Sequence, residues 1–264
     1  MIAAACSPAP TAGRDNARRT TLQRSAATSR RILGCMKRIR RIRTASLVAL
    51  AVAIVIAAVA IIAWPAWAGA ATAAPRPPIV KKYIAYGNGR KAQTIGYSKR
   101  HYHQSTYKLT NPKSIVLHHT AGSTWQSAWY TFNGNAAYNG EKPGVSAQFI
   151  IHKNGTIYQC MPLNLRARHC IGMNWKSIGI EFVQEARSGK DGHWMDRQIL
   201  KRTKQVKAGI RLVRYLKARF GIRNTDIVGH ATANKSRFFM DKTGAKNAAG
   251  DWYAAEVKLF RSRL

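Results

Sequence analysis

Short apolar runs bounded by polar and turn residues dominate the second half of the chain. Each run is rich in β-branched and aromatic residues, which is typical of strands. The predicted strands are 115–117, 145–151, 156–161, 177–183 and 226–230. Lys153-Asn154-Gly155 lies between the second and the third and predicts a tight hairpin turn.

Three other segments carry apolar residues at helical spacing. Segment 124–132 predicts a short helix, and segment 198–220 predicts a long one that ends at Gly221. Segment 252–261 predicts a closing helix for which Asp251 is a plausible N-cap. Strands and helices alternate along this half of the chain. The predicted class is therefore α/β, with a central mixed β-sheet flanked by helices.

Reactive side chains stand at the ends of these strands or inside them. His118 and His119 end the first strand, and His230 ends the last. Glu181 lies within an otherwise apolar strand, where an ionised carboxylate is uncommon unless it is paired or functional. Imidazole is a common zinc ligand, and catalytic zinc usually has three protein ligands and a water. The pattern indicates one site built on one sheet.

The spaced motifs of this region follow one another in a family-specific order. They are His118-His119-Thr-Ala-Gly, the hairpin segment 145–158, Arg168-His169, Ile178-Gly-Ile-Glu181 and Val228-Gly-His230. From about Pro112 to the C-terminus the chain resembles the zinc-dependent type 2 N-acetylmuramoyl-L-alanine amidases. That family shares its fold with phage lysozyme-like amidases and peptidoglycan recognition proteins. Several motifs in the right order make the resemblance specific.

The resemblance implies a hydrolase that cuts peptidoglycan between N-acetylmuramic acid and L-alanine with a zinc-activated water. It implies His118 and His230 as zinc ligands and Glu181 as general base. His119 remains the alternative to His118. The sequence lacks the Pro-Gly context of the family's third ligand, and Asp241 is expected there as the first carboxylate after His230. Asp251 is the alternative, although a helix cap already accounts for it.

Substrate contacts are less defined by the sequence. The resemblance implies His169 as a substrate-binding residue. The position of the family's oxyanion-stabilising lysine falls on Phe239, so Arg237, Lys242 or Lys246 would have to replace it, and the first two are expected to bind substrate. A peptidoglycan-binding module without activity is the alternative function. The presence of both histidine positions and of Glu181 favours the enzyme.

The charge of the chain predicts an anionic partner. The formal net charge is +34, and residues 71–264 contain 33 basic and 9 acidic residues, a net +24. The excess is spread along the chain, which favours phosphate- or carboxylate-bearing wall polymers beside peptidoglycan. A nucleic-acid binder would explain the charge but neither the histidines nor the export signal, so no nucleic-acid partner is expected. The protein is expected to be a monomer.

The first part of the chain is organised as an export signal. A basic leader, 1–44, with Met36 as an alternative start, precedes an apolar segment, 45–74, which is a signal peptide core or a membrane anchor. Small residues after Pro65 favour cleavage, so the protein is expected outside the cell, in the wall, or anchored on the outer face of the cytoplasmic membrane.

The exported part begins with a basic, Tyr-rich linker or arm, 75–111, and continues as the amidase domain, 112–264. The arm is expected to wrap on the domain. Cys160 and Cys170 are the two cysteines of this part. Export permits a disulfide between them, and two buried thiols are the alternative.

Overall fold

A six-stranded mixed sheet forms the centre of the protein in a computed structural model that describes residues 74–264. The strand order is β1-β4-β3-β5-β2-β6, with β3, β5, β2 and β6 parallel and β4 antiparallel to β3. The strands are β1 (Val80–Lys81), β2 (Ser114–Ala121), β3 (Phe149–Ile151), β4 (Ile157–Gln159), β5 (Ser177–Glu185) and β6 (Ile227–Gly229). The predicted α/β class is confirmed, and the hairpin closes with Ile151 opposite Ile157.

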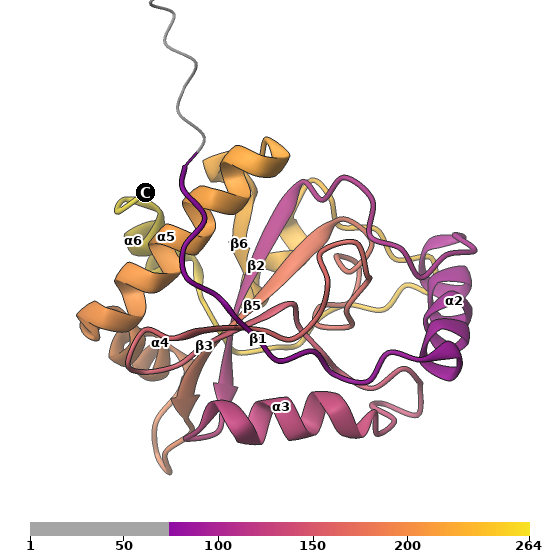
Figure 1. Cartoon of the computed structure of the whole chain (residues 1–264), viewed down its shortest axis with the longest axis horizontal. Helices are drawn as coiled ribbons and strands as arrows, with labels where there is room; N and C mark the ends of the chain where they lie inside the picture. Colours follow the sequence, from indigo (N-terminus) through magenta and orange to yellow (C-terminus); the bar gives the residue numbers. More distant parts are fainter. Residues whose placement is uncertain (1–73) are drawn as a thin grey trace, which may run out of the picture. The chain divides into compact units, whose positions relative to one another are not determined.

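Helices cover both faces of this sheet (Figure 1). One face packs against α4 (Gly192–Lys201), α5 (Thr203–Phe220) and α6 (Ala254–Arg261). The other packs against α3 (Trp125–Gly134) and long loops. The sheet residues in the core under α5 are Ile115, Leu117, Phe149, Ile151, Ile178, Ile180 and Phe182. Strand alternation therefore turns Val116, His118, Gly179 and Glu181 toward the face that α5 does not cover.

Helix ends follow the sequence in part. Thr124 caps α3 by accepting a hydrogen bond from the backbone N–H of Ser127, and Gly221 ends α5 in the left-handed conformation. The single helix predicted over 198–220 is wrong, because Arg202 leaves the helical conformation between α4 and α5. Its guanidinium donates instead to the carbonyl oxygen of Val183 and to the side-chain oxygen of Gln184, both on β5.

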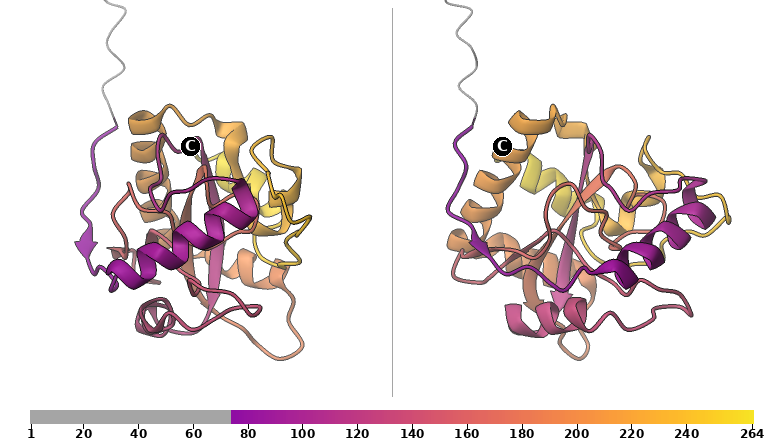
Figure 2. Two further views of the ribbon diagram at one scale, coloured as in Figure 1. Left: turned by 90° about the vertical axis from the view of Figure 1, so that its right-hand side faces the viewer. Right: turned by 45° about the vertical axis from the view of Figure 1, so that its right-hand side comes forward.

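The arm forms an ordered layer on the domain. Its strand β1 adds to the sheet edge beside β4, and its helix α2 (Asn88–Tyr102) lies on the side of the molecule opposite α5 (Figures 1 and 2). The sequence predicted an arm that wraps on the domain but not a helix. Tyr97 and Tyr102 anchor α2, since both are almost fully buried.

Two other expectations concern covalent structure and the membrane. Cys160 and Cys170 are both buried free thiols, so the alternative without a disulfide holds. None of the helices in residues 74–264 has the length and apolar character to cross a bilayer. The proposed leader and apolar segment, 1–73, lie outside the described residues.

Candidate functional site

Two neighbouring strands bring the first two site residues together. His118 on β2 is paired in register with Glu181 on β5, and both side chains emerge on the face that α5 leaves open. His119 is directed the other way, toward α4, where its Nδ1 lies 3.2 Å from a carboxylate oxygen of the buried Asp196. The choice between the two histidines therefore falls on His118.

The other two residues come from the chain after β6. His230 follows that strand directly and opens the short 3-10 helix His230–Lys235. Asp251 lies on a segment held against the start of this 3-10 helix, since the N–H of Ala231 donates to the carbonyl oxygen of Asp251 at 2.8 Å. The next residue, Trp252, is fully buried and donates its indole N–H to the carbonyl oxygen of His118 at 3.0 Å. One buried indole thus fixes Asp251 beside the end of β2.

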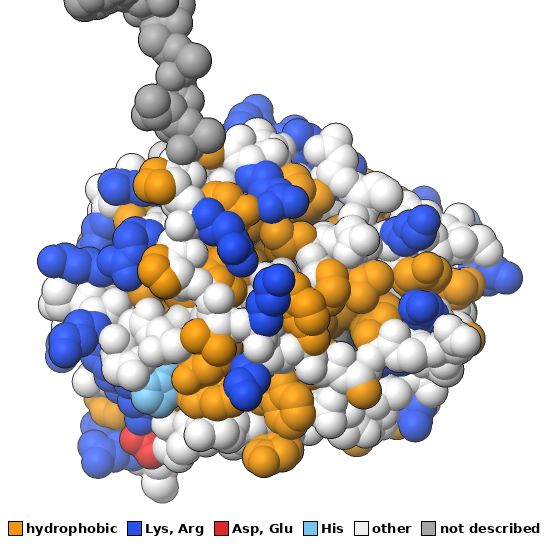
Figure 3. All heavy atoms as spheres, in the orientation of Figure 1, with side chains coloured by type: hydrophobic (Ala, Val, Ile, Leu, Met, Phe, Trp, Pro, Cys, Tyr) orange, Lys and Arg blue, Asp and Glu red, His pale blue; other side chains and the backbone are white. Residues whose placement is uncertain are grey.

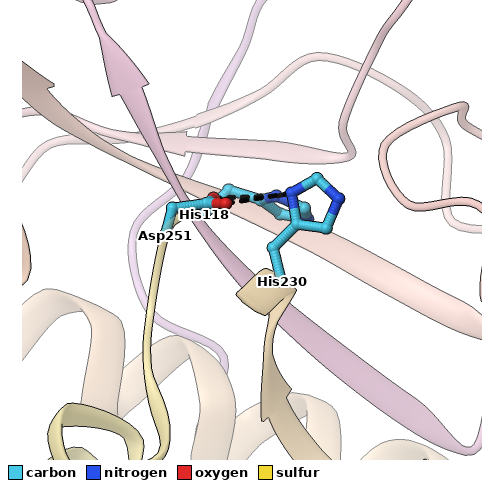
Figure 4. Close-up of side chains that lie close together, drawn as sticks. All are labelled: His118, His230 and Asp251. Atoms are coloured by element: carbon cyan, nitrogen blue, oxygen red, sulfur yellow. Dashed lines mark hydrogen bonds and ion pairs between the residues drawn. The ribbon is translucent and has the colours of Figure 1, made fainter. Parts of the chain in front are cut away.

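Three ligand atoms converge at this point (Figure 4). The Nδ1 atoms of His118 and His230 are 3.1 Å apart, and the two carboxylate oxygens of Asp251 lie 3.3 Å and 3.0 Å from them. One ligand atom from each of the three residues lies within 4.8 Å of the other two. His118 and Asp251 are only 2% and 8% exposed, so water competes little with these contacts.

The structure corrects the choice of Asp241 over Asp251 as the carboxylate beside the histidines. Asp241 accepts from the ring of His101 on α2, at 2.7 Å, and from the N–H and hydroxyl of Thr243. Asp251 is also not the cap of the last helix. That helix begins at Ala254, its N-cap residue is Tyr253, and its first turn has no side-chain cap.

Mutual contacts set the charges of the three residues. Burial, then the positive charge of His230, lowers the pKa of His118 to about 4. Burial opposes a charge on His230, but the contacts with Asp251 and Cys170 together outweigh it and raise the pKa of His230 to about 11. Burial opposes the charge on Asp251, but its contacts with the two histidine rings outweigh burial and hold its pKa well below the ordinary value. A positive charge is therefore stabilised between these atoms.

Glu181 is the one acidic group here without a partner. Its Oε2 is buried and forms no hydrogen bond with residues 74–264. Burial, followed by repulsion from Asp251, raises the pKa of Glu181 to about 8. A carboxyl group with such a pKa can exchange a proton near neutral pH, as an acid–base catalyst must.

A cleft of about 480 Å³ opens over these residues. It is lined by His118, Glu181, His230 and Asp251 and bounded by Phe132 of α3 and by other residues of the surrounding loops. A smaller hollow of about 230 Å³ adjoins it and shares His169 and His230 with it. The site residues thus lie at the floor of a cleft that can hold part of a polymer.

Of the residues that the sequence suggests for substrate binding, only His169 lines this cleft. His169 lines both hollows. Arg237 forms a bidentate pair with Asp226, with both N–O distances 2.8 Å, and lines a different depression, so its guanidinium is already engaged. Lys242 is exposed and lines neither hollow. Lys246 is the one of the three candidate cations that lines the smaller hollow beside the cleft.

The residues fit a zinc ion. Two imidazole nitrogens and a carboxylate oxygen are ligands that Zn²⁺ accepts, and three protein ligands are usual for catalytic zinc. Three electron-rich atoms converge at short range, and unpaired Glu181 Oε2 adds a fourth group that a nearby cation would favour. The sequence analysis placed Asp251 second to Asp241, because a polar residue before a helix looks like a cap. The buried Trp252 beside it was the available signal.

The sequence model described as N-acetylmuramoyl-L-alanine amidase matches residues 108–245, more than half of the chain. The chain belongs to this amidase family. The enzyme class is therefore that of the N-acetylmuramoyl-L-alanine amidases, and the family acts on peptidoglycan. The match contains His118, Glu181 and His230 but ends before Asp251.

Solved structures include similar amidases and recognition proteins. The endolysin N-acetylmuramoyl-L-alanine amidase LysCS from Clostridium intestinale URNW is 22% identical, with 70% of this chain and 96% of that chain covered and a TM-score of 0.43. The catalytic domain of XlyA is 20% identical over 61% and 88% of the two chains, with a TM-score of 0.40. PGRP-SA from Apis mellifera is 19% identical over 59% and 85%, with a TM-score of 0.38. No curated protein matches the chain significantly.

Proposed function

We propose that this amidase is zinc-dependent and hydrolyses the bond between N-acetylmuramic acid and L-alanine, with His118, His230 and Asp251 as the ligands. The convergence of these three ligand atoms at the floor of the cleft is the observation that carries the proposal. A bound zinc ion would supply Lewis-acid polarisation of the scissile carbonyl and a lower pKa for water.

Glu181 is the proposed general base. In its ionised form, Oε2 accepts a proton from the attacking water and can then deliver it to the leaving amide nitrogen. The buried, unpaired position of Oε2 supports this role, because no ion pair holds the carboxylate in one charge state. The raised pKa favours the return of the proton to the leaving group.

The test compares the full chain with Glu181→Gln on purified peptidoglycan. The wild type is expected to bind one zinc per chain and to release new amino termini on L-alanine, and chelation should abolish both signals. Glu181→Gln should keep the zinc and lose at least about 100-fold in turnover, typical of a lost acid–base group. Release of reducing sugar ends alone would contradict the amidase chemistry. Wall binding without product release would favour the non-catalytic binding module.

A row of cations on α5 supports anionic wall polymers as a further partner. Its four members are exposed and stand at helical spacings of three and four residues: Lys204, Lys207, Arg211 and Arg214. Within residues 74–264 none of the four pairs with an Asp or Glu side chain, and α5 contains no acidic residue. Arg214 alone is engaged, by hydrogen bonds to the backbone oxygens of Arg263 and Leu264. Basic side chains gather over the α4–α5 side of the molecule, and few acidic ones appear there (Figure 3).

The row spans about 15 Å along the helix, at about 1.5 Å per residue. The regular spacing of the four cations suits a linear phosphodiester or polycarboxylate polymer. Because the row lies away from the cleft, it can hold a wall polymer while the cleft acts on peptidoglycan. Such binding should depend strongly on salt.

Export to the wall is the proposed location. The basic run before an apolar segment with small residues after Pro65 supports a cleaved signal, and a retained anchor is the alternative. Amino-terminal sequencing of the protein from the culture medium and from membranes distinguishes them. A mature chain that begins between residues 66 and 76 is expected, and an intact leader on membrane-bound protein would indicate the anchor.

A further inference from the structure

A chain of hydrogen bonds runs outward from the far side of the His118 ring. Its Nε2 lies 3.0 Å from Nδ1 of His169, and Nε2 of His169 lies 3.3 Å from the hydroxyl oxygen of Ser177. Ser177 in turn donates its hydroxyl proton to the carbonyl oxygen of Met173 at 2.7 Å. The chain therefore connects the candidate metal centre with the beginning of β5.

The end of this chain fixes the position of every proton in it. A hydroxyl has one proton, and Ser177 gives it to Met173, so its oxygen can only accept from Nε2–H of His169. A neutral imidazole with a proton on Nε2 accepts at Nδ1. His118 must then donate from Nε2, so its Nδ1 carries a lone pair, which can accept the Nδ1 proton of His230 3.1 Å away.

A second chain of hydrogen bonds places a proton on Nε2 of His230. Its Nε2 lies 3.1 Å from the side-chain oxygen of Asn247. The amide nitrogen of Asn247 donates to the carbonyl oxygen of Ile171 and to the side-chain oxygen of Asn234, both at 2.9 Å, so the orientation of the amide is fixed. The Asn247 oxygen is thus an acceptor, and Nε2 of His230 is the donor.

We propose that His169, oriented by Ser177, and Asn247 are positioning residues that accept the Nε2–H of His118 and of His230. Nδ1 of both rings then faces the metal position: His118 carries its lone pair there, and His230 gains one when the metal ion displaces its Nδ1 proton. The inference rests on the proposed zinc site. It assigns His169 to ligand orientation, whereas the sequence suggested substrate contact. Partners of this kind typically change metal affinity 10- to 100-fold, by orienting the ligand and raising its basicity.

The packing around His169 supports a positioning role. The N–H groups of His169 and Cys170 both donate to the side-chain oxygen of Asn174, at 2.9 Å and 2.8 Å. The ring lies so close to β5 that a Cβ on Gly179 would approach its Cγ to 2.7 Å. Glycine at this position therefore leaves the room that the ring needs to reach His118.

The first experiment reads the tautomer directly from imidazole ¹⁵N shifts of the metal-free protein, with His118→Gln used to assign the signal. The proton of His118 is expected on Nε2 near neutral pH, and His169→Phe should mix the two tautomers. A proton on Nδ1 of His118 in the wild type would overturn the inference. This measurement needs no zinc, so it decides the inference even if the protein binds no metal, an outcome that would defeat the proposed zinc site alone.

The second experiment measures zinc affinity by competition with a chromophoric chelator. His169→Phe keeps a ring but removes the acceptor, so the Kd for zinc should rise about 10- to 100-fold. His169→Asn places an acceptor oxygen near the position of Nδ1 and should recover most of the affinity. His152→Phe, the same change at a hairpin outside the cleft, is the matched control and should leave the Kd unchanged.

Asn247→Leu tests the hydrogen bonds that hold His230, since leucine has a similar size but no acceptor. A rise in the Kd like that of His169→Phe is expected. Thermal unfolding of each metal-free variant separates orientation from folding, because a positioning role predicts weaker zinc binding without an equal loss of stability. The proposal would be overturned if His169→Phe and His169→Asn weakened zinc binding equally and in proportion to the stability that each variant loses.

Discussion

At the residue scale, a buried tryptophan decides which carboxylate faces the two histidines. Trp252 has a positive φ of 54° and no exposed surface, and it packs against Phe182 and Phe260. Gly229 permits its close approach, because a Cβ there would overlap the carbonyl oxygen of Trp252 at 1.6 Å. The position of Asp251 therefore follows from the packing of its neighbour.

This placement predicts different results for the two aspartates. Asp251→Ala should lose zinc binding, since a carboxylate of the three-ligand set is removed, while Asp241→Ala should keep zinc and lower the melting temperature. Metal content after dialysis and thermal unfolding measure the two effects. Zinc lost from Asp241→Ala and retained by Asp251→Ala would return the ligand to Asp241.

At the element scale, α2 holds loops that lie near the cleft. His101 on this helix contacts Asp241 at 2.7 Å and Glu141 at 3.0 Å, and Arg100 contacts Glu141 at 2.9 Å. Glu141 belongs to the turn that begins at Tyr138, whose side chain lines both hollows. The helix lies before the matched family region, so this chain adds its own support to the cleft.

The contacts of α2 predict a loss of stability in acid. Burial opposes the charged forms of Glu141 and Asp241. Their hydrogen bonds, which include those to His101, outweigh it, so the pKa of Glu141 lies below its ordinary 4.5 and that of Asp241 below its ordinary 3.8. Carboxylates with depressed pKa values stabilise the fold above those ordinary values, and the stabilisation is lost as the pH falls through the lower, folded-state values. The melting temperature should therefore fall between about pH 5 and pH 2.

Melting curves of Glu141→Gln and Asp241→Asn across that range test this cause. Each variant should melt earlier than the wild type at pH 7 and show a shallower decline in acid. Glu185→Gln is the control, because Glu185 forms one exposed pair with Lys153 at 3.5 Å and does not touch α2. If the melting temperatures of both variants fell in acid as steeply as that of the wild type, groups other than Glu141 and Asp241 would cause the acid sensitivity.

At the scale of the whole molecule, some basic side chains are engaged within the protein and others are free to bind an anionic partner. Cations such as Arg168 and Arg237 are engaged in hydrogen bonds inside the protein or at its surface. Among the described residues, Lys204, Lys207 and Arg211 of the row on α5 have no such partner, and Arg214 donates only to the backbone oxygens of Arg263 and Leu264. Free charges aligned on a rigid helix attract a polyanion more strongly than the same number scattered over the surface.

Charge reversal on α5 tests the polymer surface. Replacing Lys204, Lys207 and Arg211 by Glu should weaken binding to purified anionic wall polymer roughly tenfold at low salt, at about 0.5 kcal/mol per exposed pair lost. The effect should shrink as salt shortens the Debye length below about 8 Å. Hydrolysis of a small soluble muropeptide should not change, because the cleft is untouched.

The matched control makes the same change in net charge elsewhere. Replacing the exposed Lys81, Lys108 and Lys190 by Glu removes as much positive charge without touching α5. A smaller loss of polymer binding is expected. Equal losses in the two triple variants would show that net charge alone, and no particular surface, controls binding.

Five of the six strands, β2 to β6, could be predicted from the sequence alone, together with the helices α3 and α6 and the histidine–glutamate part of the site. Apolar periodicity is a local signal, so β2, β5 and β6 could be predicted together with the reactive residues on them. Strand alternation also contains the reason for His118 over His119, since residues 115 and 117 had to face the core. The break at Arg202 could not be read in this way, because its side chain bonds to β5, far away in the sequence.

The third carboxylate and the partners of the histidines depend on contacts between distant parts of the chain. The choice of Asp251 depends on the burial of Trp252 against two distant strands, and the engagement of Asp241 depends on a helix 140 residues earlier. His169 acquires its place from a serine on β5 and a glycine that makes room for its ring. Such contacts join segments far apart in the chain, and a local pattern of residues does not encode which of several equivalent side chains will meet.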